Sequence, residues 1–205
     1  MFTGIVQGTA TVRSIEDHGG IRRLRLEFPE GATNGLAQGA SVSIAGVCLT
    51  VVDQGDHDVA FDVIDETLRL TTLAALTEGA QVNFERAAKF GDEVGGHFVS
   101  GHIFGMGEVV TRTQEGENLA LVIRTSVEVM PYVLEKGYLA VDGCSLTIGA
   151  VDRDARTFGL HLIPETRAVT TLGDLNQGDT VNLEVDATTQ AVVATVERVM
   201  KERGQ

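Results

Sequence analysis

The pentapeptide Gly46-Val-Cys-Leu-Thr50 returns 97 residues later as Gly143-Cys-Ser-Leu-Thr147. A second segment, Gly79-Ala-Gln-Val-Asn-Phe-Glu85, returns 99 residues later as Gly178-Asp-Thr-Val-Asn-Leu-Glu184. Because the matched segments keep the same order along both halves of the chain, they indicate an internal duplication.

The duplication predicts two similar modules, over residues 1–97 and 98–186, and a separate tail over residues 187–205. The glycine-rich stretch 86–103 joins the modules. It lacks the Gly-Lys-Ser/Thr ending of a phosphate-binding loop, so its glycines are interpreted as a hinge. His97, which lies in this stretch, is assigned a supporting structural role.

Runs of alternating or continuous apolar residues predict about six strands in the first module. They are expected at Gly4–Val12, Ile21–Phe28, Ser41–Ala45, Cys48–Asp53, Val59–Ile64 and Gln81–Arg86. A short helix is predicted at Thr67–Leu76, with Thr67 as its capping residue. Six short antiparallel strands usually close into a barrel, because closure removes open edges. The predicted fold class is therefore all-β, with two six-stranded barrels in tandem and a C-terminal helix.

The tail is predicted to be an amphipathic helix over Gln190–Lys201. Its apolar residues Val192, Val196 and Val199 recur every three or four positions, which gives a narrow apolar stripe. Such a stripe either covers a barrel or pairs with the tails of other copies. We favour the second interpretation, oligomerisation.

The composition restricts the choice of partners and compartment. The 205-residue chain carries a net charge of −13, so it should repel nucleic acid and anionic membranes. Its two cysteines, Cys48 and Cys144, fit free thiols in a reducing compartment. The sequence contains no charged-then-apolar leader and no apolar run of the roughly 20 residues that span a bilayer. A soluble cytoplasmic protein is expected.

The duplicated pentapeptide places a thiol and a hydroxyl at one structural position, because Cys48 corresponds to Ser145. A lone cysteine in a strand is more often a small buried apolar residue. Two positions further on, Thr50 and Thr147 repeat a hydroxyl on the same face. A wall that faces a ligand explains this pattern better than a core position does.

The pairs Glu66-Thr67 and Glu165-Thr166 follow equivalent strands in the two modules. A helix start explains them locally, since threonine caps and a carboxylate interacts well with the helix dipole. A polyol ligand would require the same hydroxyl and carboxylate groups. Asp62 and His161 occupy equivalent positions with different side chains, so they are expected to distinguish the two modules.

Two polar residues of the second module correspond to apolar residues in the first, and a third polar residue lies close to one of them in the sequence. His102 corresponds to Ile5 and Asp142 corresponds to Ala45, while Lys136 lies just before the strand that leads to Asp142. This asymmetry predicts that the second module carries most of the chemistry. For Asp142 a hairpin turn is a good alternative, because Asp-Gly is a strong turn signal. No metal-ligand spacing and no nucleophile elbow appear.

Several long motifs resemble the riboflavin synthase alpha-chain family, and the resemblance covers essentially the whole chain. They are Met1-Phe-Thr-Gly-Ile-Val-Gln7, Gly46-Val-Cys-Leu-Thr-Val51, Glu85-Arg-Ala-Ala-Lys89, Gly95-Gly-His-Phe-Val-Ser-Gly-His102, Asp142-Gly-Cys-Ser-Leu-Thr147 and His161-Leu-Ile-Pro-Glu-Thr166. One departure is Ala45, where the family often has Asn before Gly.

The resemblance implies two homologous six-stranded Greek-key β-barrels in tandem and a homotrimer held partly by C-terminal helices. It implies a dismutation in which one 6,7-dimethyl-8-ribityllumazine donates a four-carbon unit to another. The products would be riboflavin and 5-amino-6-(ribitylamino)pyrimidinedione. No cofactor and no metal are implied, and an association with lumazine synthase is left open. Catalysis would occur where the N-terminal barrel of one subunit faces the C-terminal barrel of the next.

The resemblance also implies the residues that line the two lumazine sites. They are Gly4, Ile5, Val6, Cys48, Leu49, Thr50, Asp62, Val63, Ile64, Asp65, Glu66, Thr67, Gly101, His102, Ile103, Lys136, Ser145, Leu146, Thr147, Leu162, Ile163, Pro164, Glu165, Thr166 and Arg167.

The catalytic candidates among them follow from the chemistry of the implied reaction, which needs a base and a nucleophile. His102 is the hypothesis for proton transfer, because imidazole exchanges protons near neutral pH. Ser145 and Thr147 would position one ring, and Cys48 would act as nucleophile or position a water at the other. Asp142 is added as a further catalytic candidate.

Two other functions compete with this interpretation. The first is a non-catalytic lumazine- or flavin-binding antenna protein, which would be expected to lose the motif residues of one barrel. The second is the flavin domain of a reductase, for which the chain has no room to hold a nicotinamide-binding module.

Overall fold

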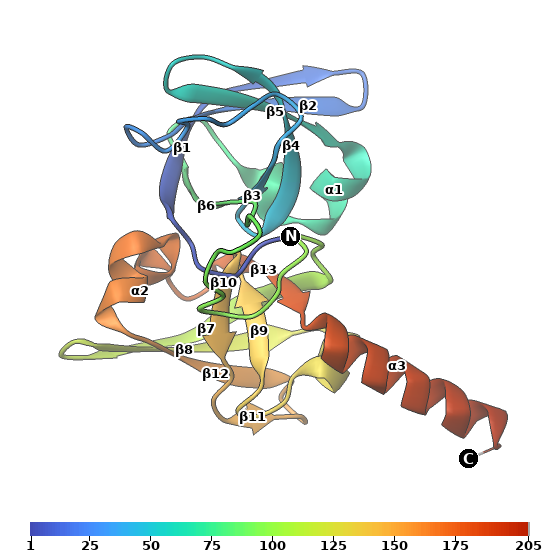
Figure 1. The fold of residues 1–205 in the computed structure, drawn as a ribbon. Helices are drawn as coiled ribbons and strands as arrows, with labels where there is room; N and C mark the ends of the chain where they lie inside the picture. The colour runs from blue at the N-terminus through green and yellow to red at the C-terminus, as the bar shows by residue number, and fades with distance from the viewer. Residues whose placement is uncertain (205) are drawn as a thin grey trace.

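The computed structural model describes residues 1–204, and the last residue of the predicted tail, Gln205, lies outside the described residues. Two β-modules lie one above the other, and a long helix projects from the second module (Figure 1). None of the helices formed by residues 1–204 has the length and apolar character that crossing a membrane would require.

The first module is a closed barrel of six strands in the order β1-β2-β5-β4-β3-β6. The strands are β1 (Gly8–His18), β2 (Ile21–Glu27), β3 (Ser41–Ile44), β4 (Val47–Gln54), β5 (Asp58–Ile64) and β6 (Gln81–Arg86). Their inward residues form one apolar core that includes Leu24, Phe61 and Phe84. The predicted six-stranded barrel is confirmed here.

The second module is a curled sheet of seven strands in the order β10-β9-β13-β7-β8-β12-β11. The strands are β7 (Gly105–Glu115), β8 (Asn118–Thr125), β9 (Tyr138–Val141), β10 (Cys144–Thr147), β11 (Val151–Asp152), β12 (Thr157–Leu162) and β13 (Thr180–Val185). The prediction of six strands misses one break: the strand that corresponds to β4 is divided into β10 and β11. At this break the Gly149 N–H donates to the Gly159 carbonyl of β12 at 2.8 Å. This hydrogen bond ties the segment between β10 and β11 to the other edge of the sheet.

A short helix follows the equivalent strands β5 and β12 in each module. These helices are α1 (Asp65–Leu70) and α2 (Pro164–Val169), and short 3-10 turns cover Thr72–Ala75, Met130–Tyr132 and Thr171–Asp174.

The predicted cap at Thr67 is wrong, because α1 begins directly where β5 ends and Thr67 lies inside the helix. The helix has no side-chain cap at its start, and the carboxylates of Asp65 and Glu66 in its first turn complement the helix dipole. The capping threonine is Thr71, whose Oγ1 accepts from the Leu73 N–H at the start of the following 3-10 turn.

The two hairpin tips meet where the modules touch. Ala45 and Gly46 have φ values of 47° and 83°, and Asp142 and Gly143 have values of 45° and 82°, as a two-residue type I′ turn requires. A Cβ atom on Gly46 would lie 2.7 Å from the backbone nitrogen of Gly143, so only glycine allows the hairpins to approach this closely. The hairpin alternative for Asp142-Gly143 is thus confirmed.

Two buried asparagines bridge the modules symmetrically. The Asn83 amide donates to the Asp142 carbonyl at 3.0 Å, and the Asn182 amide donates to the Ala45 carbonyl at 2.8 Å. Each asparagine comes from the last strand of one module and contacts the hairpin tip of the other. The glycine-rich stretch therefore connects two modules that are already fixed to each other, which does not fit the hinge interpretation.

The predicted tail helix is confirmed as α3 (Ala187–Glu202), and it begins three residues before the predicted start at Gln190. Asp186 caps it by accepting from the Thr189 N–H at 2.7 Å. Val192, Val196 and Met200 follow each other on one face of α3 and are 59%, 50% and 47% exposed. These three side chains are thus left open by the rest of residues 1–204, and α3 projects away from both modules (Figure 1).

Candidate ligand-binding sites

The first residues of the chain serve the second module. Gly4–Val6 was predicted as the start of a strand of the first barrel, but β1 begins only at Gly8. The Gly4 carbonyl accepts from the Ser145 N–H at 2.8 Å, and Val6 packs in the core of the second module. Gly4 has a φ of +73°, which glycine adopts easily and which turns the chain across the boundary.

The corresponding segment Gly101–Ile103 serves the first module in return. The Gly101 carbonyl accepts from the Cys48 N–H at 2.8 Å, and Ile103 packs against the first core. The two crossing segments pair with each other at Phe2 and Val99 through backbone hydrogen bonds of 2.7 and 3.0 Å. The segment that opens each half of the sequence thus packs against the module formed by the other half, and we call these two the exchanged segments.

This exchange decides which predicted residues lie together. A cavity of about 150 Å³ in the first module is lined by Cys48, Glu66, Thr67, Gly101 and His102, among others. We call this place the Cys48 site. We call the place that the repeat makes equivalent in the second module the Ser145 site. There the Gly4 carbonyl accepts from the Ser145 N–H, and the repeat assigns Ile5, Glu165 and Thr166 to the positions that His102, Glu66 and Thr67 hold in the first module.

His102 and Ser145, which both come from the second half of the sequence, therefore lie at different sites. His102 belongs to the second half of the sequence but lines the Cys48 site of the first barrel. The repeat alone could not reveal this, because an exchange of leading segments leaves the internal matches unchanged.

Each site has an unpaired strand edge beside it. β5 pairs with β2 as far as Ile64, but it pairs with β4 only up to Phe61. The backbone of residues 62–64 therefore has no strand partner on the side that faces β4, where Thr50 is exposed. In the second module β12 likewise pairs with β8 as far as Leu162, while β11 pairs only with Thr157 and Phe158.

Asp62 and His161, which the repeat makes equivalent, have different surroundings. Arg23 holds the Asp62 carboxylate with two hydrogen bonds of 2.7 and 2.9 Å. This guanidinium keeps the pKa of Asp62 below its ordinary value. His161 instead lies beside Gly149 and lines a cavity of about 430 Å³ together with Ala120.

His97 is a candidate that the sequence did not reveal. Its Nδ1 lies 2.6 Å from the Ser145 hydroxyl, its ring stacks on Tyr138, and its Nε2 is buried without a partner among residues 1–204. Burial lowers the pKa of His97, which favours the neutral imidazole. The segment is closely packed here, since a Cβ atom on the neighbouring Gly96 would clash with the Thr3 carbonyl.

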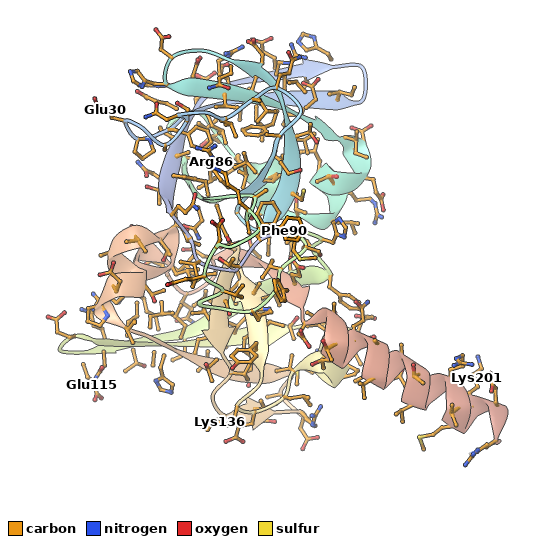
Figure 2. The ribbon with its side chains drawn as sticks, viewed as in Figure 1. Glu30, Arg86, Phe90, Glu115, Lys136 and Lys201 are labelled. Carbon is orange, nitrogen blue, oxygen red and sulfur yellow. The ribbon has the colours of Figure 1, made fainter. Side chains whose placement is uncertain are left out.

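Two further predicted site residues, Thr147 and Lys136, lie at exposed or outlying positions. Thr147 is exposed on β10, two residues beyond Ser145. Lys136 projects from the far end of the second module in Figure 2 and has a φ of +65°. Residues 1–204 contain no group of three or more histidine, cysteine or acidic side chains that could hold a metal ion.

Asp142 is buried at the module boundary rather than open to a cavity. Its Oδ1 accepts from the Asn182 N–H at 2.8 Å, and burial raises its pKa from 3.8 to about 7. Between these two values the folded protein binds a proton that the unfolded chain has released. Stability therefore falls as the pH rises from about 4 to about 7, and the loss caused by this group levels off above that.

Replacing Asp142 with asparagine is expected to flatten this pH dependence, because the amide cannot ionise. One pKa unit corresponds to about 1.4 kcal/mol, so the variant should gain up to about 4 kcal/mol over the wild type at pH 8. Urea unfolding at pH 5 and pH 8 measures the effect. Asp154→Asn, at an exposed position, is the matched control. An unchanged pH dependence in Asp142→Asn would contradict the assignment.

Two stacked β-modules, one a closed barrel and one a curled sheet, each completed by the leading segment of the other half, define a protein with a tandem repeat of one β-domain. The family model that matches is the lumazine binding domain, once over residues 3–87 and again over residues 100–186. The chain belongs to the riboflavin synthase family. It is 47% identical to riboflavin synthase of Escherichia coli (strain K12) over 99% of this chain and 95% of that one.

Other relatives and solved structures agree. Riboflavin synthase of Mycobacterium bovis is 41% identical over the full length of both chains. The crystal structure of LumP complexed with 6,7-dimethyl-8-(1'-D-ribityl) lumazine superposes with a TM-score of 0.82 at 26% identity, covering 91% of this chain and 99% of that one. LumP complexed with riboflavin gives a TM-score of 0.83 at 28% identity, covering 91% and 100%.

Proposed function

We propose that this chain converts two molecules of 6,7-dimethyl-8-ribityllumazine into riboflavin and 5-amino-6-(ribitylamino)pyrimidinedione. The observation that carries the proposal is the presence of two sites built alike, because the reaction uses two copies of one substrate. A four-carbon unit leaves one lumazine and joins the other. The two products together contain all the atoms of the two substrates, so the reaction consumes no external oxidant or reductant.

The Cys48 site offers complementary groups to each part of a lumazine. The unpaired backbone of residues 62–64 can exchange hydrogen bonds with the imide edge of the pyrimidine ring, as an added strand would. Glu66 and Thr67, on the first turns of α1, can bind the hydroxyls of the ribityl chain. His102 and Cys48 then lie next to the remaining ring, where the methyl groups react.

The Ser145 site offers the same arrangement with different reactive groups. The edge of β12 at Leu162 takes the place of residues 62–64, and Glu165 with Thr166 takes the place of the polyol-binding pair. The Ser145 hydroxyl, which lies 2.6 Å from His97 Nδ1, takes the position that the Cys48 thiol has in the other site. The two sites can therefore treat their two lumazines differently.

The reaction requires a proton to leave the 7-methyl group of one lumazine and a nucleophile to add at C7 of the other. In the proposal His102 exchanges the proton, because imidazole can both accept and donate one. Cys48 supplies a thiol that adds to C7 or positions a water there. Holding two substrates in register supplies a further part of the rate.

A single chain does not complete the proposed active centre. We include in the proposal a homotrimer, in which the Cys48 site of one subunit faces the Ser145 site of the next. The exposed stripe on α3 supports this assembly, since three such stripes could bury one another. The cytoplasm, where both thiols stay reduced, is the proposed compartment. An association with lumazine synthase stays a prediction of the resemblance.

Deleting residues 189–205 is expected to shift the assembly towards monomers and to abolish most riboflavin formation. The point variant Val196→Glu should do the same, because it places a charge within the stripe. Thr195→Glu, at the neighbouring exposed position, is the matched control. Sedimentation velocity measures the assembly, and an unchanged profile for the deletion would refute the role of α3.

A non-catalytic antenna protein is the second candidate, because the similar LumP structures hold a lumazine and riboflavin. Both sites of this chain keep their reactive groups, Cys48 with His102 and Ser145 with His97. That observation favours catalysis. The test is whether riboflavin appears when the purified protein is given the lumazine; binding without conversion would favour the antenna function.

A further inference from the structure

A buried carboxylate fixes each of the exchanged segments. Glu85 Oε1 accepts from the N–H and the hydroxyl of Thr3 at 2.6 and 2.7 Å, and its Oε2 accepts from the Gly4 N–H at 3.0 Å. Glu184 Oε1 accepts from the N–H and the hydroxyl of Ser100 at 2.7 and 2.6 Å. Its Oε2 accepts from the Gly101 N–H at 2.9 Å. The two sets of hydrogen bonds are equivalent.

Each carboxylate belongs to one module but holds a segment that lines the site of the other. Glu85 lies in the last strand of the first module, yet the segment that it holds forms a wall of the Ser145 site. Glu184 lies in the last strand of the second module, and the segment that it holds forms a wall of the Cys48 site. Both carboxylates are almost fully buried, with exposures of 3% and 6%.

The segments need an external restraint. Gly4 and Gly101 have φ values of +73° and +83°, and glycine has the greatest conformational freedom of all residues. Hydrogen bonds to an ionised acceptor are the strongest available to a backbone N–H. The carboxylate is thus the group that keeps each glycine carbonyl on the N–H of Ser145 or Cys48.

We infer that Glu85 and Glu184 are crossed positioning residues, each of which sets the geometry of the ligand site in the module opposite to its own. Loss of Glu85 should disturb the Ser145 site and spare the Cys48 site. Loss of Glu184 should do the reverse. The inference rests on the proposed function only in treating these places as ligand sites.

Hydrogen exchange of two backbone amides tests the inference without any ligand or turnover. The full-length variants are Glu85→Gln and Glu184→Gln, because glutamine keeps the volume but presents N–H groups to the donors. The exposed Glu135→Gln is the matched control. The reporters are the Ser145 N–H, which donates to the Gly4 carbonyl, and the Cys48 N–H, which donates to the Gly101 carbonyl.

We expect Glu85→Gln to accelerate exchange at the Ser145 amide by about tenfold or more and to leave the Cys48 amide within about twofold of wild type. Glu184→Gln should give the opposite pattern. Equal acceleration at both amides, acceleration at the amide of the variant's own module, or no acceleration would overturn the inference.

Two milder variants keep the test decisive if a glutamine variant fails to fold. Thr3→Val and Ser100→Ala each remove one hydroxyl donor from Glu85 or Glu184, and they should show the same crossed pattern with smaller factors. A second readout addresses ligand binding: riboflavin should slow exchange at the Cys48 amide in Glu85→Gln but not in Glu184→Gln. If the crossed pattern holds without ligand but riboflavin protects neither amide in the wild type, the proposed function fails and the inference stands.

Discussion

Replacing His102 with glutamine is expected to slow riboflavin formation at saturating substrate by about 10- to 100-fold. Glutamine has a similar size and can still form hydrogen bonds, but it cannot take a proton from the 7-methyl group and return it. Because His102 is exposed at the edge of the Cys48 site, its loss should not disturb the fold. Steady-state kinetics measures the rate, and a fluorescence titration with riboflavin measures binding, which should be retained.

His57→Gln is the control for this variant, since His57 is also exposed but lies in the turn between β4 and β5. It should leave both the rate and the binding unchanged. A wild-type rate in His102→Gln would remove His102 from the proton transfer. A rate that falls only because riboflavin no longer binds would assign His102 to ligand binding instead.

Replacing Phe2 with alanine is expected to lower the free energy of unfolding by about 3–5 kcal/mol. Phe2 is fully buried and packs with Val99 and Ala140 where the two exchanged segments cross. The variant leaves a cavity between the modules, which the backbone bridge to Val99 prevents from closing completely. Urea unfolding measures the loss.

Phe90→Ala is the contrasting control, because Phe90 is fully exposed in the joining stretch and its removal should change the stability of the chain by no more than about 0.5 kcal/mol (Figure 2). A loss of less than about 1 kcal/mol in Phe2→Ala would show that the crossing point contributes little to the fold.

The duplicated segments were sufficient to predict the architecture. Matches such as Gly46 with Gly143 reflect a physical requirement, since both glycines form the hairpin tips that meet at the module boundary. The break between β10 and β11 could not be predicted in the same way. It depends on how the backbone near Gly149 pairs with Gly159, and no alternation of apolar residues records that choice.

The site was predicted less completely than the fold. The repeat shows that Cys48 and Ser145 are equivalent, but it does not show which residues lie beside them. His102 and His97 reach different sites because the chain crosses between modules at Phe2 and Val99. Contacts between residues so far apart in sequence leave no periodic signal, so only the three-dimensional arrangement reveals them.

The most direct test of the proposed function is to incubate the purified protein with 6,7-dimethyl-8-ribityllumazine and to follow lumazine and riboflavin by absorbance. We predict that riboflavin accumulates without any added cofactor, and that one riboflavin forms for every two lumazines consumed. Saturable binding of the lumazine with no riboflavin formed would contradict the proposal and would identify a binding protein instead.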